Sequence, residues 1–346
     1  MLRKIIRKPR AAEWAYIVAR VRVMKRKLIP KDEYNKLLNM DLNEIIRYLE
    51  ESEYKNEINE LAIRYSGVEL LDYALYLNLT RTYRKLVRIS KGLPREMIVD
   101  YLRKWDFWNL KNIIRGKMFG FPKEEIEKTL VPAGEFDEEF WKMLLARESV
   151  EDIIKEFAKK PYYPILEELA RACPISEFED RLDKFYYTSL ASIHSDNIDI
   201  MYFVDFIRME IDIKNVKTLL RLKLEGASPE EIAAKIIPKG YQLSESELRK
   251  LAAMDYEDML KNLENYWFSE AVKQIKDQPL SKIEVFFDKV WAKRVLSRAN
   301  HFPLSILPVL AFILMKKIEV DNLRIIARGK AEGMSAEEIK EQLVVV

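Results

Sequence analysis

Apolar residues recur three and four positions apart along most of the chain, which is the spacing that places them on one face of an α-helix. Strict alternation of apolar and polar residues, which would indicate a half-buried strand, is confined to short runs. Glycine occurs only nine times, and strong helix formers dominate. The pattern predicts an all-α fold. Three stretches show it in register, with apolar positions at Leu110, Ile113 and Ile114, at Val216, Leu219 and Leu220, and at Leu323, Ile326 and Ala327.

Polar residues stand at identical offsets in the same three stretches. In each, an acid is followed at fixed spacing by Asn, Arg, Lys and Gly, and then by Glu-Glu-Ile. Successive copies of the Asn lie 106 and then 107 residues apart. So many positions do not coincide three times by chance, and we interpret them as an internal triplication. The signature positions are Asp106, Asn109, Arg115, Lys117 and Gly120; Asp212, Asn215, Arg221, Lys223 and Gly226; and Glu319, Asn322, Arg328, Lys330 and Gly333.

Each copy predicts a helix, a turn and a second helix. Asp106 and Asp212 are candidate N-caps, because a short carboxylate accepts a free N–H of the first turn. The glycine of each copy follows the last helical residues, where it takes up the left-handed conformation without a Cβ penalty. Ser228 and Ser335, each followed by two glutamates, are expected to cap the next helix.

The polar members of the signature have two interpretations. In the functional one, Asn, Arg and Lys form a repeated binding site. In the structural one, the three asparagines are helix-packing residues, and the Arg and Lys side chains cover neighbouring repeats. We favour the structural interpretation, because a repeated structure predicts repeated structural residues.

The remaining sequence divides in the same way. An amphipathic pair of helices over 34–49 has counterparts over 140–157 and 248–263. A later helix that contains Asp183-Lys184 matches one that contains Asp288-Lys289, and a weaker version of it contains Asp72-Tyr73. Aromatic residues in these helices are expected in the core. An apolar helix then leads into the next signature. The repeat spacing predicts three helical units over 1–105, 106–211 and 212–346, the last carrying closing helices that pack beside the N-terminal helix.

Composition and motifs favour a protein without chemistry of its own. The 59 Lys and Arg residues nearly balance the 56 Asp and Glu residues, so no nucleic-acid partner is indicated. There is no nucleotide-binding glycine loop and no nucleophile motif. His194 and His301 lack companions at metal-ligand spacing, and Cys173 is expected to fill the core. We predict no catalytic, cofactor-binding or metal site. The apolar run 304–315 is too short to span a bilayer.

The signatures together resemble the C subunit of archaeal A-type and bacterial V/A-type ATP synthases, a relative of the eukaryotic V-ATPase d subunit. The residues that carry the resemblance are Tyr16 to Arg22, the helices that begin at Asp106 and Asp212, and the helices around Asp183 and Asp288. The third signature departs by having Glu319 in place of Asp. The resemblance covers essentially the whole chain.

The resemblance implies a fold and a role. The expected fold is an all-α funnel of three similar domains around a pseudo-threefold axis. The expected role is that of a non-catalytic central-stalk rotor subunit, without cofactors. It would be peripheral at the cytoplasmic face of the cell membrane, between the proteolipid (c/K) ring and the axle subunits D and F. The rival hypotheses are a free-standing helical-repeat adaptor that binds other proteins and, less favoured, an enzyme whose repeated Arg and Lys residues bind an anion.

One difference between copies suggests an interface. Only the first copy has two aromatic residues, Phe119 and Phe121, around its glycine. An asymmetric axle cannot contact three similar units equally, so positions that differ between copies are the better interface candidates. We expect this turn either to contact a partner, since large apolar groups at a turn seldom stay exposed without a use, or to fold back onto the core of its own unit.

Overall fold

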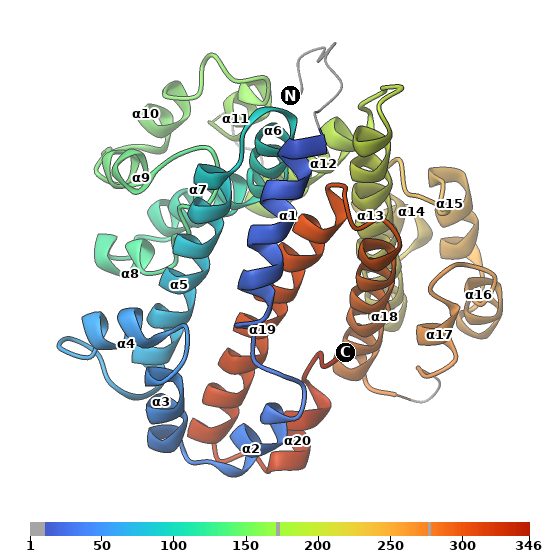
Figure 1. The fold of residues 1–346 in the computed structure, drawn as a ribbon. Coiled ribbons are helices and arrows are strands. Elements are labelled where there is room, and N and C mark those ends of the chain that lie inside the picture. Colours follow the sequence, from blue (N-terminus) through green and yellow to red (C-terminus); the bar gives the residue numbers. More distant parts are fainter. Residues whose placement is uncertain (1–10, 171–173, 276–277) are drawn as a thin grey trace.

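The computed structural model describes residues 11–170, 174–275 and 278–346, and within these residues every regular element is a helix. Long helices cross the middle of the molecule, and shorter helices lie around them in three groups, at the upper left, at the right and at the bottom of Figure 1. The all-α prediction is confirmed. Cys173 lies outside the described residues.

Each group consists of one signature helix, four short helices and one long returning helix, in the same order. The first contains α7 (Lys104–Met118), α8 (Lys123–Glu127), α9 (Glu138–Leu145), α10 (Val150–Lys155), α11 (Tyr163–Ala170) and α12 (Ile175–Ala191). The second contains α13 (Ile198–Leu224), α14 (Pro229–Lys235), α15 (Glu245–Ala253), α16 (Tyr256–Leu263), α17 (Ser269–Val272) and α18 (Leu280–His301). The third contains α19 (Leu307–Ala331), α20 (Ala336–Glu341), α2 (Glu33–Asn39), α3 (Leu42–Glu50), α4 (Lys55–Leu61) and α5 (Gly67–Ile89).

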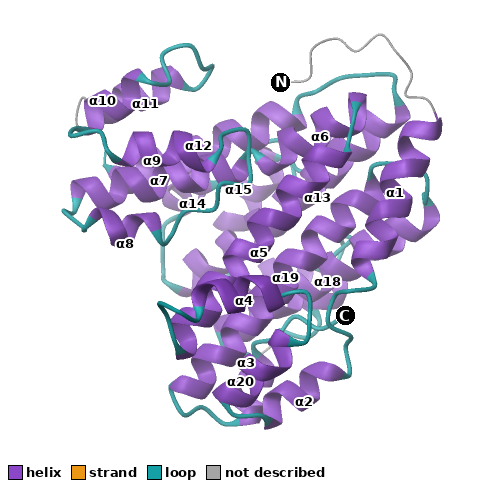
Figure 2. Ribbon diagram, turned by 60° about the vertical axis from the view of Figure 1, so that its left-hand side comes forward, coloured by secondary structure: helices purple, strands orange, loops and turns teal. Residues whose placement is uncertain are grey.

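The third group joins the two ends of the chain. Helix α20 contacts α2, and α19 packs along both α5 and α1 (Ala11–Lys25). Figure 2 shows α20 beside α2 and α3 below the long helices. The Tyr83 hydroxyl on α5 donates a hydrogen bond to the carbonyl oxygen of Ile313 on α19 at 2.8 Å, where both groups are buried. The C-terminal helices therefore pack against the N-terminal ones.

The signature helices begin earlier than the sequence predicts. Asp212 lies in the middle of α13, a single helix of 27 residues, and Glu319 lies in the second half of α19. Only in the first copy does the helix break, between α6 (Gly92–Leu102) and α7 at Arg103. The expectation that Asp106 and Asp212 are N-caps was wrong. Helix α7 already begins at Lys104, two residues before Asp106, and Asp212 lies well inside α13, where the apolar helix before it continues into the signature.

The turns after the signature helices follow the sequence. Gly120, Gly226 and Gly333 have φ of 70°, 79° and 74°, the left-handed region that a residue with a Cβ avoids. Ser228 and Ser335 form complete capping boxes with the glutamates three residues later, which confirms the predicted caps. The first copy has Pro122 at this position and no side-chain cap.

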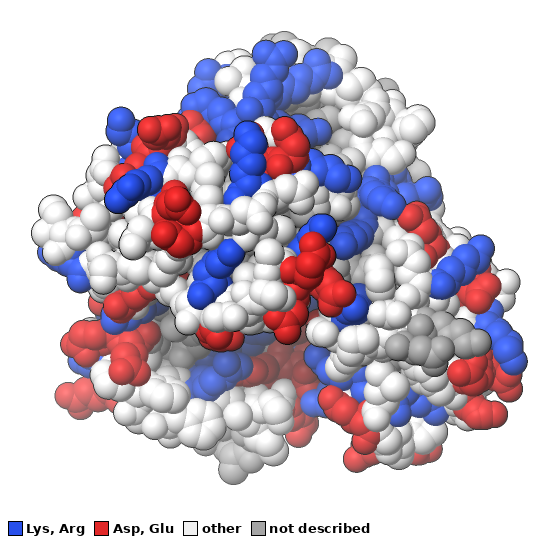
Figure 3. All heavy atoms as spheres, turned by 90° about the horizontal axis from the view of Figure 1, so that it is seen from below, with Lys and Arg blue, Asp and Glu red and all other residues white. Residues whose placement is uncertain are grey.

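Charged side chains of both signs are spread over the surface of the molecule (Figure 3). Acidic and basic side chains are interspersed on the face seen from below in Figure 3, so this face has no extended area of one sign. In the described part of the chain, no helix is both long and apolar enough to cross a membrane.

Candidate functional site: a central cavity and its supports

The three signature asparagines make the same pair of hydrogen bonds. Each donates its amide to the carbonyl oxygen of the residue 22 positions later and accepts that residue's backbone N–H, at distances of 2.7–2.9 Å. The side chains are almost fully buried. Each amide therefore fastens the segment after the short helix onto the signature helix. The pairs are Asn109 with Val131, Asn215 with Ile237, and Asn322 with Val344.

The signature acids hold the next loop through its backbone. Asp106 accepts the N–H groups of Glu135 and Phe136, at 2.7 and 3.3 Å. Asp212 accepts three N–H groups, at positions 241–243, and the Trp267 indole N–H. Burial raises the pKa of Asp106 to about 7, although the two backbone hydrogen bonds act in the opposite direction. Burial also raises the pKa of Asp212.

Two glycines leave the space that these carboxylates occupy. A Cβ on Gly134 would overlap the carboxyl group of Asp106, and a Cβ on Gly240 would overlap an oxygen of Asp212 and lie 2.5 Å from a backbone oxygen. Glycine therefore recurs at 134 and 240, 106 residues apart, because only glycine lets the loop approach the acid so closely.

Glu319 makes a different set of contacts. Its carboxylate accepts the backbone N–H of Ile29 at 2.5 Å, the Tyr54 hydroxyl at 2.6 Å and the ammonium of Lys316 at 2.8 Å. Ile29 and Tyr54 belong to the N-terminal part of the chain, so the third acid joins the C-terminal helix to the N-terminal segment. Glu has a longer side chain than Asp, so its carboxylate reaches Ile29 and Tyr54 in the N-terminal part of the chain.

Basic side chains on each signature helix, two and six residues after its asparagine, connect it to the returning helix of its group. Lys111 and Lys217 bind Asp183 and Asp288, at 2.8 and 2.9 Å. In the third group Arg324 binds Asp72 at 2.8 Å. One helical turn later, Arg115 binds Glu179 with two nitrogens, Arg328 binds Asp72 at 2.6 Å, and Arg221 lies 4.0 Å from Glu284.

The signature lysines lie at the helix ends. Lys117 donates to the carbonyl oxygen of Arg147 at 2.6 Å, and Lys330 donates to that of Leu38. Lys223 is half-buried and has no acceptor within hydrogen-bond distance among the described residues. The structure therefore distributes the repeated residues over three groups of helices and does not bring them together into one site.

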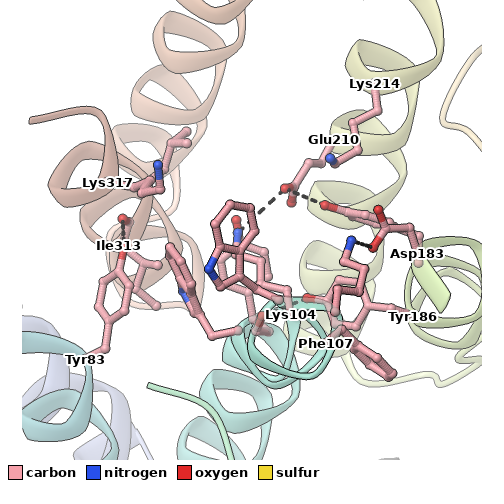
Figure 4. A pocket seen from close by; sticks show the side chains of 15 residues that line it. Tyr83, Lys104, Phe107, Asp183, Tyr186, Glu210, Lys214, Ile313 and Lys317 are labelled. Carbon is pink, nitrogen blue, oxygen red and sulfur yellow. Dashed lines mark hydrogen bonds and ion pairs between the residues drawn. The ribbon is translucent and has the colours of Figure 1, made fainter. Parts of the chain in front are cut away.

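The groups instead meet at a central cavity of about 310 Å³. Figure 4 shows its lining side chains converging from α5, α7, α12, α13 and α19, and Tyr101 of α6 completes the wall. Aromatic side chains form most of the apolar surface. Six charged residues line the cavity, namely Lys104, Lys111, Lys214, Lys317, Asp183 and Glu210.

The charges in the cavity are only partly paired. Lys104 lies 3.7 Å from Glu210, which also accepts the Tyr187 hydroxyl at 3.1 Å. Lys317 binds Asp321 on its own helix. Lys214 has no carboxylate partner among the described residues, and its ammonium lies 5.1 Å from the centre of the Tyr187 ring.

A sequence signal for this cavity existed in the differences between the copies. Lys104, Glu210 and Lys317 each stand two residues before the signature acid, and Lys214 stands two residues after it. Positions that differ between copies are interface candidates, but the sequence pointed only to the glycine turn. Which side of the helix faces the centre was not evident, because these helices have apolar residues on most sides.

Phe119 and Phe121 are exposed, at 63% and 53%. The alternative in which both rings fold back onto the core of their own unit is therefore not found. Neither residue lines the central cavity. Among the described residues, no group of His, Cys, Asp and Glu has the arrangement of a metal site.

The comparison with known proteins decides the family. The sequence model of the ATP synthase (C/AC39) subunit family matches residues 17–342. The chain belongs to this family. It is 51% identical to the C subunit of the A-type ATP synthase of Archaeoglobus fulgidus over 99% of both chains. It is 41% identical to that of Methanococcoides burtonii, over 97% of this chain and 95% of the relative.

A more distant relative supports the same assignment. The corresponding protein of Halobacterium salinarum is 33% identical over 97% of this chain and 98% of its own length. Similarity therefore extends along nearly the whole length of both proteins. The chain is a structural subunit of an ATP synthase complex and not a catalytic one.

Proposed function

We propose that the protein is the central-stalk rotor subunit that couples the proteolipid (c/K) ring to the axle subunits D and F in an archaeal-type ATP synthase. It would lie at the cytoplasmic face of the cell membrane and be held there through the ring. The observation that carries this proposal is the central cavity, because residues from all three groups of helices converge on it and part of its charge is unpaired. A socket that receives one end of an axle needs these properties.

The construction of the molecule suits the transmission of torque. Each returning helix is bound to a signature helix by side-chain ion pairs, and the chain ends are joined through Glu319. Networks of this kind resist relative movement of the helices better than isolated surface pairs. A coupling subunit requires rigidity and two interfaces, and it does not require an active site.

The three groups of helices also support a pseudo-threefold architecture. The predicted units 1–105, 106–211 and 212–346 remain the division along the sequence. In space, we propose that the third unit combines helices α19 and α20 with α2 to α5, so that both ends of the chain contribute to one unit. This arrangement is supported by the equivalent Asn pairs and by the ion pairs from α7 to α12, from α13 to α18, and from α19 to α5.

The decisive experiment is assembly from purified parts. The full chain is mixed with the D–F heterodimer and with detergent-solubilised proteolipid ring, and complexes are separated by size-exclusion chromatography. The proposal expects the chain to bind each partner alone and to bring both into one complex. A chain that binds neither partner would favour the adaptor hypothesis. The enzyme hypothesis is tested with the triple variant Arg115→Ala, Arg221→Ala and Arg328→Ala. If this variant still assembles but no longer binds phosphate that the unchanged chain binds, the result favours the enzyme hypothesis.

A further inference from the structure

A second recess, of about 190 Å³, lies between α1, α5 and α19 and shares no lining residue with the central cavity. Figure 1 shows α1 crossing in front of α19, with α5 to its left. Basic side chains from all three helices and from the segment after α1 line this recess, and a single acid accompanies them. The basic residues are Arg20, Lys27, Lys85 and Lys316, and the acid is Glu53.

Two of the four cations are paired within the fold. Lys27 binds Glu53 at the surface, where both side chains are about half exposed. Lys316 is 3% exposed, and its ammonium donates to Glu319 and to the Tyr54 hydroxyl, both at 2.8 Å. An ammonium group has three N–H donors. One donor of this buried lysine therefore has no acceptor among the described residues.

The other two cations, Arg20 and Lys85, have no acid partner. Arg20 is exposed on α1 and Lys85 is half-buried on α5, and neither side chain makes an ion pair or a hydrogen bond within the described part of the chain. Each signature arginine, by contrast, faces a carboxylate of a returning helix. Ion pairing inside the fold therefore does not account for Arg20, although it lies in one of the stretches that carry the family resemblance.

The donors of the recess match a tetrahedral anion. A guanidinium group, two ammonium groups and the half-buried Thr82 hydroxyl line it together. A phosphoryl group has three acceptor oxygens and up to two negative charges, and Arg and Lys are its usual partners. A carboxylate has two oxygens and one charge and would leave donors unused. The volume is below the roughly 300–1,000 Å³ of sites for drug-sized ligands, so it suits a single phosphoryl group.

We infer that this recess binds a phosphoryl group, with Arg20 and Lys85 as its principal cations and with Lys316 and Thr82 as further donors. The inference concerns the chain by itself and does not depend on the proposed function. Inorganic phosphate and the headgroup of phosphatidic acid both offer this group, and the test distinguishes the two sources.

The test follows thermal unfolding of the full chain in sodium phosphate and in sodium chloride of equal ionic strength. Phosphate is expected to raise the melting temperature saturably beyond the effect of chloride. Arg20→Gln and Lys85→Gln should each weaken the apparent affinity roughly tenfold, because each removes a hydrogen bond from a charged donor. Arg22→Gln removes the same charge from an exposed position on α1 that does not line the recess, so it is the matched control and should bind normally.

Flotation identifies the source of the phosphoryl group. The full chain is mixed with vesicles of phosphatidylcholine, with and without phosphatidic acid. Flotation that requires phosphatidic acid, is weakened in Arg20→Gln and is competed by free phosphate assigns the recess to a lipid headgroup. Stabilisation by phosphate without flotation assigns it to a free anion.

Three outcomes would overturn the inference. The first is a chain that phosphate stabilises no more than chloride does and that floats with neither kind of vesicle. The second is an equal loss of affinity in Arg20→Gln and Arg22→Gln, which would reveal a general effect of charge. The third is phosphate binding that survives in Arg20→Gln but is lost in the triple variant of the signature arginines, since that variant leaves the recess intact.

Discussion

The side-chain amide of Asn215 and the peptide groups of Ile237 form a closed pair, in which Nδ2 donates to the carbonyl oxygen and Oδ1 accepts the N–H, both at 2.8 Å. Asn215 is 1% exposed. These two hydrogen bonds satisfy the backbone N–H and C=O of Ile237, which lies in a buried segment without regular structure.

Replacing Asn215 by Leu should therefore lower the free energy of unfolding by about 2–4 kcal/mol, since a buried donor and a buried acceptor are left unsatisfied. Urea unfolding followed by circular dichroism measures the change. Asn262→Leu is the control, because that amide is exposed and bonds only within its own helix. An equal effect at both positions would contradict the structural role of Asn215.

Asp72 is expected to couple the chain ends through Arg328. A double-mutant cycle with Asp72→Asn and Arg328→Gln should give a coupling of about 0.5–1 kcal/mol, which falls with added salt because Arg328 is more than half exposed. The cycle for the exposed pair of Lys155 and Asp152 serves for comparison and should be closer to zero. A coupling at Asp72 no larger than this reference would show that the ion pair does not fasten α5 to α19.

Removing residues 343–346 should destabilise the whole protein. The deletion exposes the site of Leu343, which is 1% exposed, and takes away the Val344 peptide groups that pair with Asn322. We expect a loss of about 3–5 kcal/mol, from the lost burial and the unsatisfied amide. Deleting only 345–346 leaves both interactions in place. A similar melting temperature for the two deletions would refute the expectation.

Asp106 should make stability depend on pH. Its pKa is about 7 in the folded chain and about 4 in the unfolded chain. The folded state therefore holds a proton that the unfolded state releases between these values. The contribution is fully present below pH 4 and is lost as the pH rises through 7. In the unchanged protein, unfolding free energy should fall by up to about 4 kcal/mol from pH 4 to pH 8 through this group.

Asp106→Asn removes this titration, so its unfolding free energy should vary less between pH 5 and pH 8 than that of the unchanged protein. Urea unfolding at both values gives the comparison. Identical slopes with pH in the two proteins would mean that Asp106 is ionised throughout this range.

Phe119 and Phe121 are predicted to contact a partner. Because both rings are exposed, the double change to Ser should alter the unfolding free energy by no more than about 0.5 kcal/mol, while binding to the proteolipid ring or to D–F is weakened. Assembly chromatography and urea unfolding are carried out on the same samples. Ile63→Ser is the control, since Ile63 is 88% exposed at another turn. Retained binding to both partners would rule out the interface.

Local interactions made much of this fold predictable from the sequence. The period of the apolar residues predicted helices, and the left-handed glycines and the caps at Ser228 and Ser335 followed from residue chemistry within a few positions. The N-cap assignment of Asp212 failed because the propensity of the preceding apolar residues extended the helix through it. Whether the helix continues through Asp212 or begins there depends on the packing of α13 against α12 and α18.

The sequence by itself determined the helical class, the repetition of the signature and the family resemblance, because each of these depends on residue types and their spacing. Only the tertiary structure decided what the repeated residues touch and where the cavity lies. Asp72 meets Arg328 across 256 positions, and the cavity unites Tyr83, Lys104, Glu210 and Lys317 from separate helices. Side chains this far apart in the sequence become neighbours only after the long helices have packed. A helix that is apolar on most sides has no periodicity that would show which side faces the centre of the molecule.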